Sequence, residues 1–91
     1  MKHLSLTIYG KVQGVFFRLS AKEKAEELGI CGWIKNNSDG TVSIEAEGEQ
    51  KDLDAFAAWC RNGPPNSKIE SIHKEQNDNL QNYSTFDIFP N

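Results

Sequence analysis

The sequence predicts an α+β sandwich in which two helices lie on one face of an antiparallel sheet. Two observations carry this prediction. Segments with a two-residue hydrophobic repeat alternate with two segments that have a helical repeat, in the order β-α-β-β-α-β. A last pair of apolar residues, Phe86 and Ile88, marks a short extra strand towards the C-terminus. A chain of 91 residues has room for one compact core, so a single domain over residues 1–91 is expected.

The first third of the chain predicts a strand followed by a helix. Residues 3–9 alternate strictly, with Leu4, Leu6 and Ile8 on one face, as in a half-buried strand. From residue 17 apolar side chains recur at intervals of three and four, which is typical of a helix that buries one face. The members of this stripe are Phe17, Ala21, Ala25 and Leu28. The glycine at position 29 is expected to end the helix.

A hairpin is expected next. Residues 31–36 and 41–48 have the composition of strands, and the four residues between them end in the Asp-Gly pair typical of tight turns. In the second of these strands Val42, Ile44 and Ala46 are expected to face the core.

The remaining elements are a helix and a strand. Apolar residues at 53, 56, 57 and 60 predict a second helix, which Pro64 and Pro65 cannot continue. Residues 67–75 predict a fourth strand, in which Ile69 and Ile72 depart from strict alternation and indicate a bulge or a change of register. Residues 77–84 have the polar composition of a loop.

This order of elements is that of the ferredoxin-like split βαβ unit. In such a unit the first two strands run parallel, with the third strand between them, so both end at the same edge of the sheet. Asn36, at the end of the second strand, is therefore expected close to the loop that follows the first strand.

Charge and composition exclude several classes of function. The first 22 residues contain four cations and no acid, whereas residues 39–54 contain six acids and one lysine. That acidic segment would repel nucleic acid. No apolar run approaches the ~18 residues of a membrane span, and the N-terminus lacks the pattern of a secretory signal. We therefore expect a cytoplasmic protein without nucleic-acid or membrane partners.

The cysteines and histidines do not suggest a metal site. Cys31 and Cys60 are too far apart for a metal-binding pair, and we expect both to be reduced and buried. His3 and His73 stand apart from any carboxylate motif and are expected to be strand or surface histidines. We expect neither a metal nor a cofactor, and nothing in the sequence demands a dimer, so a monomer is expected.

The loop from Gly10 to Arg18 is the strongest candidate for a binding site. Gly10 and Gly14 allow conformations and close approaches that a side chain would forbid, and the backbone N–H groups of residues 13–17 can then surround an anion. Arg18 lies in the first turn of the helix, where a cation is unfavourable unless an anion is bound. The loop therefore predicts a phosphate site, the plainer alternative being a simple turn followed by a solvated arginine.

Two segments of the chain resemble the signature of a known family. The runs GKVQGVFFR at 10–18 and GWIKNNSDGTV at 32–42 are similar to those of acylphosphatases, which hydrolyse carboxyl-phosphate anhydrides. The resemblance extends through residues 86–89 and implies the same sandwich with the last strand at its edge. It also implies that Arg18 binds the phosphate and that Asn36 orients a water molecule. The residues expected to bind substrate are Gln13, Gly14, Val15, Phe16 and Phe17.

The chemistry expected from these residues is hydrolysis by water. No serine, cysteine or histidine lies beside a base that could activate it, and an amide such as that of Asn36 can fix a water but not deprotonate it. Since an acyl phosphate has a good leaving group, neither a strong base nor a metal is required. We expect a metal-independent acylphosphatase that releases a carboxylate and inorganic phosphate. Two alternatives stay open: a noncatalytic module that binds phosphate or acyl phosphate, and Asn37 in place of Asn36.

Overall fold

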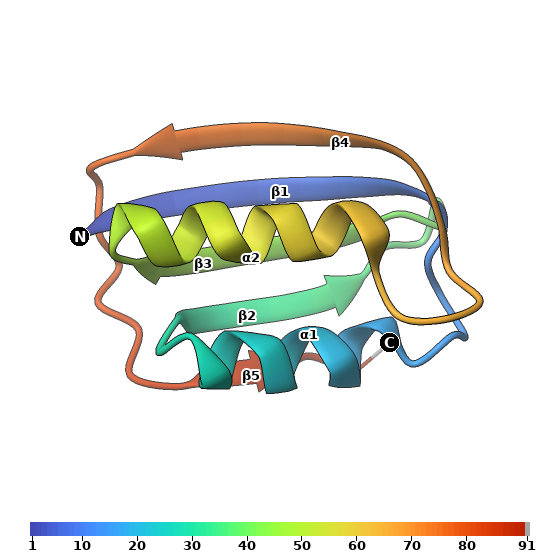
Figure 1. Cartoon of the computed structure of the whole chain (residues 1–91), viewed down its shortest axis with the longest axis horizontal. Coiled ribbons are helices and arrows are strands. Elements are labelled where there is room, and N and C mark those ends of the chain that lie inside the picture. The colour runs from blue at the N-terminus through green and yellow to red at the C-terminus, as the bar shows by residue number, and fades with distance from the viewer. Residues whose placement is uncertain (91) are drawn as a thin grey trace.

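The computed structural model describes residues 1–90 as two helices on a five-stranded sheet (Figure 1). The elements are β1 (Lys2–Lys11), α1 (Phe17–Glu27), β2 (Cys31–Asn36), β3 (Val42–Gly48), α2 (Gln50–Asn62), β4 (Lys68–Asn77) and β5 (Phe86–Ile88). The predicted β-α-β-β-α-β order and the short last strand are confirmed.

The strands are arranged in the order β4-β1-β3-β2-β5. The pairs β1–β3, β1–β4 and β2–β3 are antiparallel, as predicted, so β1 and β2 run parallel with β3 between them. β5 lies at the edge but is parallel to β2, and the sheet is therefore mixed rather than wholly antiparallel. The reason is topological: β4 ends at the same end of the sheet as the start of β2, with β1 and β3 between them, and the loop that crosses this end brings β5 into the sheet in the same direction as β2.

Both helices cover one face of the sheet (Figure 1). The inward-facing residues of β1 and β3 are fully buried beneath them, as their alternation predicts. From the helices, Phe17, Ala21 and Ala25 of α1 and Phe56 of α2 complete the core. Burying each large side chain of this kind stabilises the fold by about 1.5–3 kcal/mol. The opposite face of the sheet has no helix over it.

The pairing of β1 with β4 is irregular near the end of β1. The register of this pair shifts between Tyr9 and Gly10, which confirms the irregularity predicted from Ile69 and Ile72. Gly10 has φ +130°, and a Cβ there would lie 2.0 Å from the carbonyl oxygen of Lys68. Glycine is required because the two backbones touch at the point where β1 passes into the loop that precedes α1.

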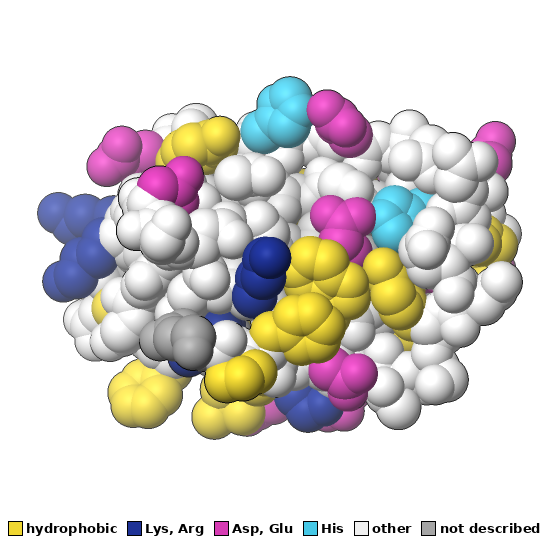
Figure 2. Space-filling model, turned by 180° about the vertical axis from the view of Figure 1, so that it is seen from behind, with side chains coloured by type: hydrophobic (Ala, Val, Ile, Leu, Met, Phe, Trp, Pro, Cys, Tyr) yellow, Lys and Arg dark blue, Asp and Glu magenta, His cyan; other side chains and the backbone are white. Residues whose placement is uncertain are grey.

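His3 lies in strand β1, as expected, but it does not stand apart from carboxylates. Its ring is buried on the open face of the sheet, with Nε2 2.6 Å from Glu45 Oε1 and Nδ1 2.7 Å from Glu47 Oε2. Figure 2, which shows this face, has each histidine beside an acidic side chain. This contact could not be predicted, because only the register of β1 with β3, which pairs His3 with Glu47, brings the side chains together.

The Glu47 carboxylate also holds the loop between β4 and β5. It accepts hydrogen bonds from the backbone N–H groups of Gln81 at 2.5 Å and Asn82 at 2.9 Å. The cluster of His3, Glu45 and Glu47 thus holds this loop against the sheet. Residues 1–90 contain no group of three or more His, Cys, Asp or Glu side chains arranged to hold a metal ion.

The prediction that both cysteines are buried holds for only one of them. Cys60 is buried, and its surroundings raise the pKa of its thiol, whereas Cys31 is only half-buried; both are free thiols. Neither helix in residues 1–90 is long and apolar enough to cross a membrane.

Candidate active site

A pocket of about 290 Å³ opens at the edge of the sheet where β1 and β2 end. Its size is near the lower end of the range for small-molecule sites. The residues that line it are Val12, Gly14, Phe16, Phe17, Arg18, Leu19, Asn36 and Ile88. The loop after β1 and the end of β2 therefore meet, as the strand order predicts.

The positive end of helix α1 lies at this pocket. Phe16, the residue before the helix, has φ 63° and forms no side-chain cap, and no acidic residue occurs in the first turn. The first N–H groups of a helix have no partner within the helix and carry a partial positive charge. A helix start without a cap or an acid is well suited to bind an anion.

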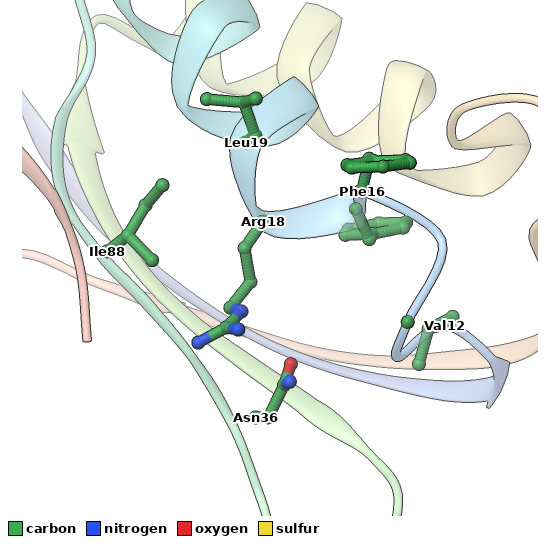
Figure 3. Close-up of a pocket in the computed structure, with 8 residues that line it drawn as sticks. Val12, Phe16, Arg18, Leu19, Asn36 and Ile88 are labelled. Atoms are coloured by element: carbon green, nitrogen blue, oxygen red, sulfur yellow. The ribbon is translucent and has the colours of Figure 1, made fainter. Parts of the chain in front are cut away.

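Arg18 extends from the first turn of α1 into the pocket. Its Nη1 donates a hydrogen bond of 2.7 Å to the backbone carbonyl of Phe89, just after β5. In Figure 3 its guanidinium points towards the side chain of Asn36. Among residues 1–90 no carboxylate lies within salt-bridge distance of Arg18. Its charge is therefore not neutralised by a carboxylate of residues 1–90, and its remaining N–H donors can bind a ligand.

Asn36 is the last residue of β2 and faces Arg18 across the pocket (Figure 3). Its Oδ1 atom is buried and accepts no hydrogen bond from the described part of the chain. Buried polar atoms almost always have a partner, so an acceptor left without one inside a pocket points to a bound water or ligand group.

Comparison with known proteins identifies the family. A family model described as Acylphosphatase matches residues 4–88. An acylphosphatase of Methylococcus capsulatus is 46% identical over 72 residues, which are 79% of this chain and 78% of that protein. The chain belongs to the acylphosphatase family. A crystal structure of acylphosphatase from Bacillus subtilis has 34% sequence identity and a TM-score of 0.97, covering 99% of this chain and all of the other. The structure of an acylphosphatase from Coxiella burnetii has 39% sequence identity and a TM-score of 0.92, and the match covers 97% of this chain and 92% of that one.

The acylphosphatase signature is divided between the loop and the hairpin. Of the residues expected to bind substrate, Gly14, Phe16 and Phe17 line the pocket. Val15 lies in the same loop with its side chain buried. The side chain of Gln13 donates two hydrogen bonds of 2.9 Å to carbonyls of the β2–β3 turn, at residues 37 and 41. Gln13 thus braces the loop against the hairpin, and phosphate binding by the N–H groups of 13–17 stays a prediction.

The two adjacent asparagines of the acylphosphatase motif have different environments. Asn36 lines the pocket, whereas the side chain of Asn37 donates to Thr41 Oγ1 at 2.9 Å and to Ser43 Oγ at 2.7 Å. Asn37 therefore stabilises the turn. Of the two asparagines, Asn36 is the one that lines the pocket, and its role there stays a prediction.

Four contributors to the acylphosphatase pocket were not among the predicted site residues, and one of them is Val12, at the start of the loop. Leu19 and Ile88 also line the pocket, and the carbonyl of Phe89 binds Arg18. One signal for Leu19 was present, because it is an apolar residue outside the apolar stripe of its helix. Ile88 and Phe89 could not be placed, since nothing in a three-residue strand states which edge of the sheet it joins.

Proposed function

We propose that this protein hydrolyses acyl phosphates to a carboxylate and inorganic phosphate, with residues 1–91 acting as one acylphosphatase domain. The observation that carries the proposal is the pairing, in one pocket, of an arginine and an asparagine oxygen that find neither an acidic partner nor a hydrogen-bond donor, respectively, among residues 1–90. Family membership supports the same reaction.

In this proposal Arg18 and the loop bind the phosphate. The guanidinium offers paired donors that match phosphate oxygens, and a dianion accepts stronger hydrogen bonds than a neutral carbonyl does. The N–H groups of residues 13–17 and the start of α1 share the charge. Arg18 keeps its bond to the carbonyl of Phe89 and binds the substrate with its remaining N–H donors.

Asn36 orients the attacking water. Its Oδ1 accepts a hydrogen bond from the water, which leaves a lone pair of the water oxygen directed at phosphorus. The new P–O bond forms as the bond to the acyl oxygen breaks, and the carboxylate departs with the bonding electrons. One water proton stays on the phosphate product and the other passes to solvent or to a phosphate oxygen. Positioning and charge stabilisation are sufficient for such a phosphoryl transfer.

The proposed reaction is metal-independent. The permanent charge of Arg18 and an array of backbone donors supply the neutralisation of phosphate oxygens that a divalent ion supplies in other phosphoryl-transfer enzymes.

We also propose that the protein acts as a monomer in the cytoplasm. Both cysteines are free thiols, as is usual in a reducing compartment. The long edge strand β4 carries exposed charges, such as those of Lys68, Glu70 and Lys74, which discourage pairing with a second sheet.

Hydrolysis of benzoyl phosphate in the presence of a chelator tests the function. The comparison uses the unmodified protein, Arg18→Ala, Asn36→Ala and, as a control, Tyr9→Ala, which removes an exposed aromatic ring that does not line the pocket. Folding of each variant is checked by circular dichroism. We expect chelator-insensitive turnover that falls by a factor on the order of 10²–10³ in both pocket variants and is unchanged in the control.

Two outcomes would count against this proposal. Phosphate binding without turnover by the unmodified protein would favour the noncatalytic binding module. Full activity in a folded Arg18→Ala variant would show that the phosphate is held elsewhere.

A further inference from the structure

Three apolar side chains surround the polar part of the pocket, and we refer to Phe16, Leu19 and Ile88 together as the apolar rim. Phe16 is 80% exposed and Leu19 is 50% exposed, while Ile88 is half-buried. All three line the same pocket as Arg18. Figure 3 shows Ile88 on one side of the Arg18 side chain and Phe16 on the other.

Phe16 is unfavourably placed in two respects. Its backbone is in the left-handed region, at φ 63°, which is uncommon for a bulky residue and strained. Its ring is at the same time the most exposed of the large hydrophobic side chains in residues 1–90. Burial in the core therefore does not compensate the strain, nor does a side-chain cap on α1. Backbone strain of this kind is characteristic of residues that contact a ligand.

The pocket is larger than the phosphate site requires. Its volume of about 290 Å³ equals the share of roughly ten water molecules in the liquid. Arg18 and Asn36 are the polar side chains among the lining residues, and all the others are apolar or glycine. A ligand that matches this lining has an anionic head for Arg18 and an apolar group directly attached to it.

We propose that the apolar rim is the subsite for the acyl group of the substrate and that Phe16 is its main specificity-determining residue. The inference rests on the proposed function and extends it to a substrate class: acyl phosphates with an aromatic or branched apolar acyl group are preferred over acetyl phosphate. The ring of Phe16 covers the acyl group once the phosphate is bound to Arg18, and the apolar surface of both is then removed from water.

Binding of phosphonates tests this subsite without requiring turnover. Benzylphosphonate and methylphosphonate have the same anionic head and differ in the apolar group, and calorimetry gives the ratio of their affinities. Phe16→Asn removes the ring with a residue that tolerates the left-handed conformation, so the fold is not stressed. Phe16→Tyr retains the ring, and Leu19→Ser reduces the other exposed part of the rim. Tyr9→Asn, outside the pocket, is the matched control.

We expect the unmodified protein to bind benzylphosphonate about tenfold more tightly than methylphosphonate, which is within the range that one apolar group contributes to discrimination. The ratio should fall towards one in Phe16→Asn, decrease in Leu19→Ser, and persist in Phe16→Tyr and Tyr9→Asn. The affinity for inorganic phosphate should be the same in all variants.

Several results would overturn the subsite. Equal affinity for the two phosphonates in the unmodified protein would do so, as would binding of neither phosphonate, or a preference that survives both Phe16→Asn and Leu19→Ser. Turnover of benzoyl and acetyl phosphate is measured in parallel. A phosphonate preference that depends on Phe16, without turnover of either substrate, would overturn the proposed hydrolysis and leave the subsite standing.

Discussion

The guanidinium of Arg18 and the backbone carbonyl of Phe89 are joined by a hydrogen bond of 2.7 Å. Phe89 is itself fixed in two ways. Its N–H donates to the carbonyl of Ile34 at 2.9 Å, and its ring stacks on Trp33 with centroids 5.0 Å apart and planes 7° from parallel. The segment after β5 thus connects the open face of the sheet, through one carbonyl, to the charged group of the pocket.

Phe89→Ala should weaken substrate binding more than it weakens the fold. The change removes the stack on Trp33, worth about 0.5–1.5 kcal/mol, and leaves the carbonyl without its lateral support. We expect a severalfold increase in KM for benzoyl phosphate with a smaller change in kcat. Steady-state kinetics with Phe89→Trp, which preserves the stack, provides the control. Identical KM values in all three proteins would contradict a positioning role for Phe89.

The neighbouring asparagines should respond in opposite ways to truncation. Asn37→Ala loses two side-chain hydrogen bonds and should reduce the free energy of unfolding by about 1–2 kcal/mol while retaining most of the activity. Asn36→Ala removes an acceptor that no donor within residues 1–90 satisfies, so the stability of this variant should hardly change while turnover is lost. Urea denaturation and turnover of the two variants, measured side by side, check both statements. The reverse pattern would transfer the water-orienting role to Asn37.

Two glycines of the same loop should differ in their tolerance of alanine. In Gly10→Ala the new Cβ would lie 2.0 Å from the carbonyl of Lys68, and we expect a loss of about 3 kcal/mol or failure to fold. At Gly14, with φ +73°, nothing lies within 4 Å of a Cβ, so Gly14→Ala should cost only the ~1–2 kcal/mol of the left-handed conformation. Thermal unfolding of both variants distinguishes a contact between backbones from a conformational preference. Equal losses of stability in the two variants would show that β4 can shift to accommodate a side chain at position 10 at little energetic cost.

The cluster of His3, Glu45 and Glu47 gives the fold a dependence on pH. Burial alone would lower the pKa of His3, but the hydrogen bonds and charges of the two carboxylates outweigh it and raise that pKa above 6.5. Burial alone would raise the pKa of Glu47, but hydrogen bonds from the loop backbone and from His3 hold it below 4.5. The contribution of His3 to the free energy of unfolding is thus complete below pH 6.5 and is lost as the pH rises through the pKa of His3 in the folded protein. The Glu47 contribution is complete above pH 4.5 and lost as pH falls through the folded pKa.

The stabilisation by this cluster should therefore be greatest between pH 4.5 and 6.5. We expect the difference in unfolding free energy between the unmodified protein and His3→Gln to fall by on the order of 1 kcal/mol as pH rises from that window to the alkaline side. Urea denaturation across this range measures it. His73→Gln, which changes an exposed histidine outside this cluster, is measured in parallel as the control. A difference that does not vary with pH would mean that His3 is uncharged in the folded protein.

The core was predictable because apolar residues repeat every two residues in the strands and every three to four residues in the helices. The strand order was predictable because the resulting order of elements is that of the split βαβ unit. The placement of Asn36 beside the Gly10–Arg18 loop followed from the same order, since parallel strands separated by one neighbour end at the same edge. The separate positions of Asn36 and Asn37 were not decided by the pattern, because a shift of one residue reverses which side chain faces the pocket.

Contacts that depend on the register of two strands, or on which edge of the sheet a strand joins, could not be predicted from the sequence. His3 meets Glu47 only because β1 and β3 pair in one particular register, and the two residues are 44 positions apart. The bond from Arg18 to Phe89 spans 71 positions and requires β5 to join the sheet beside β2. The exposure of Phe16 results from a left-handed backbone conformation that has no sequence signature in a phenylalanine.

The strand order also has a consequence for how the protein reaches its native state. Among the strand pairs of residues 1–90, only β2–β3 joins consecutive segments; the others connect distant parts of the chain. Pairing of this kind makes folding slow, because loop-closure entropy is lost before the contacts form. The pocket needs β1 aligned with β2 across β3, and β5 added afterwards at the edge. Recovery of ligand binding during refolding would thus be a late event, and it would report completion of the sheet rather than formation of the helices.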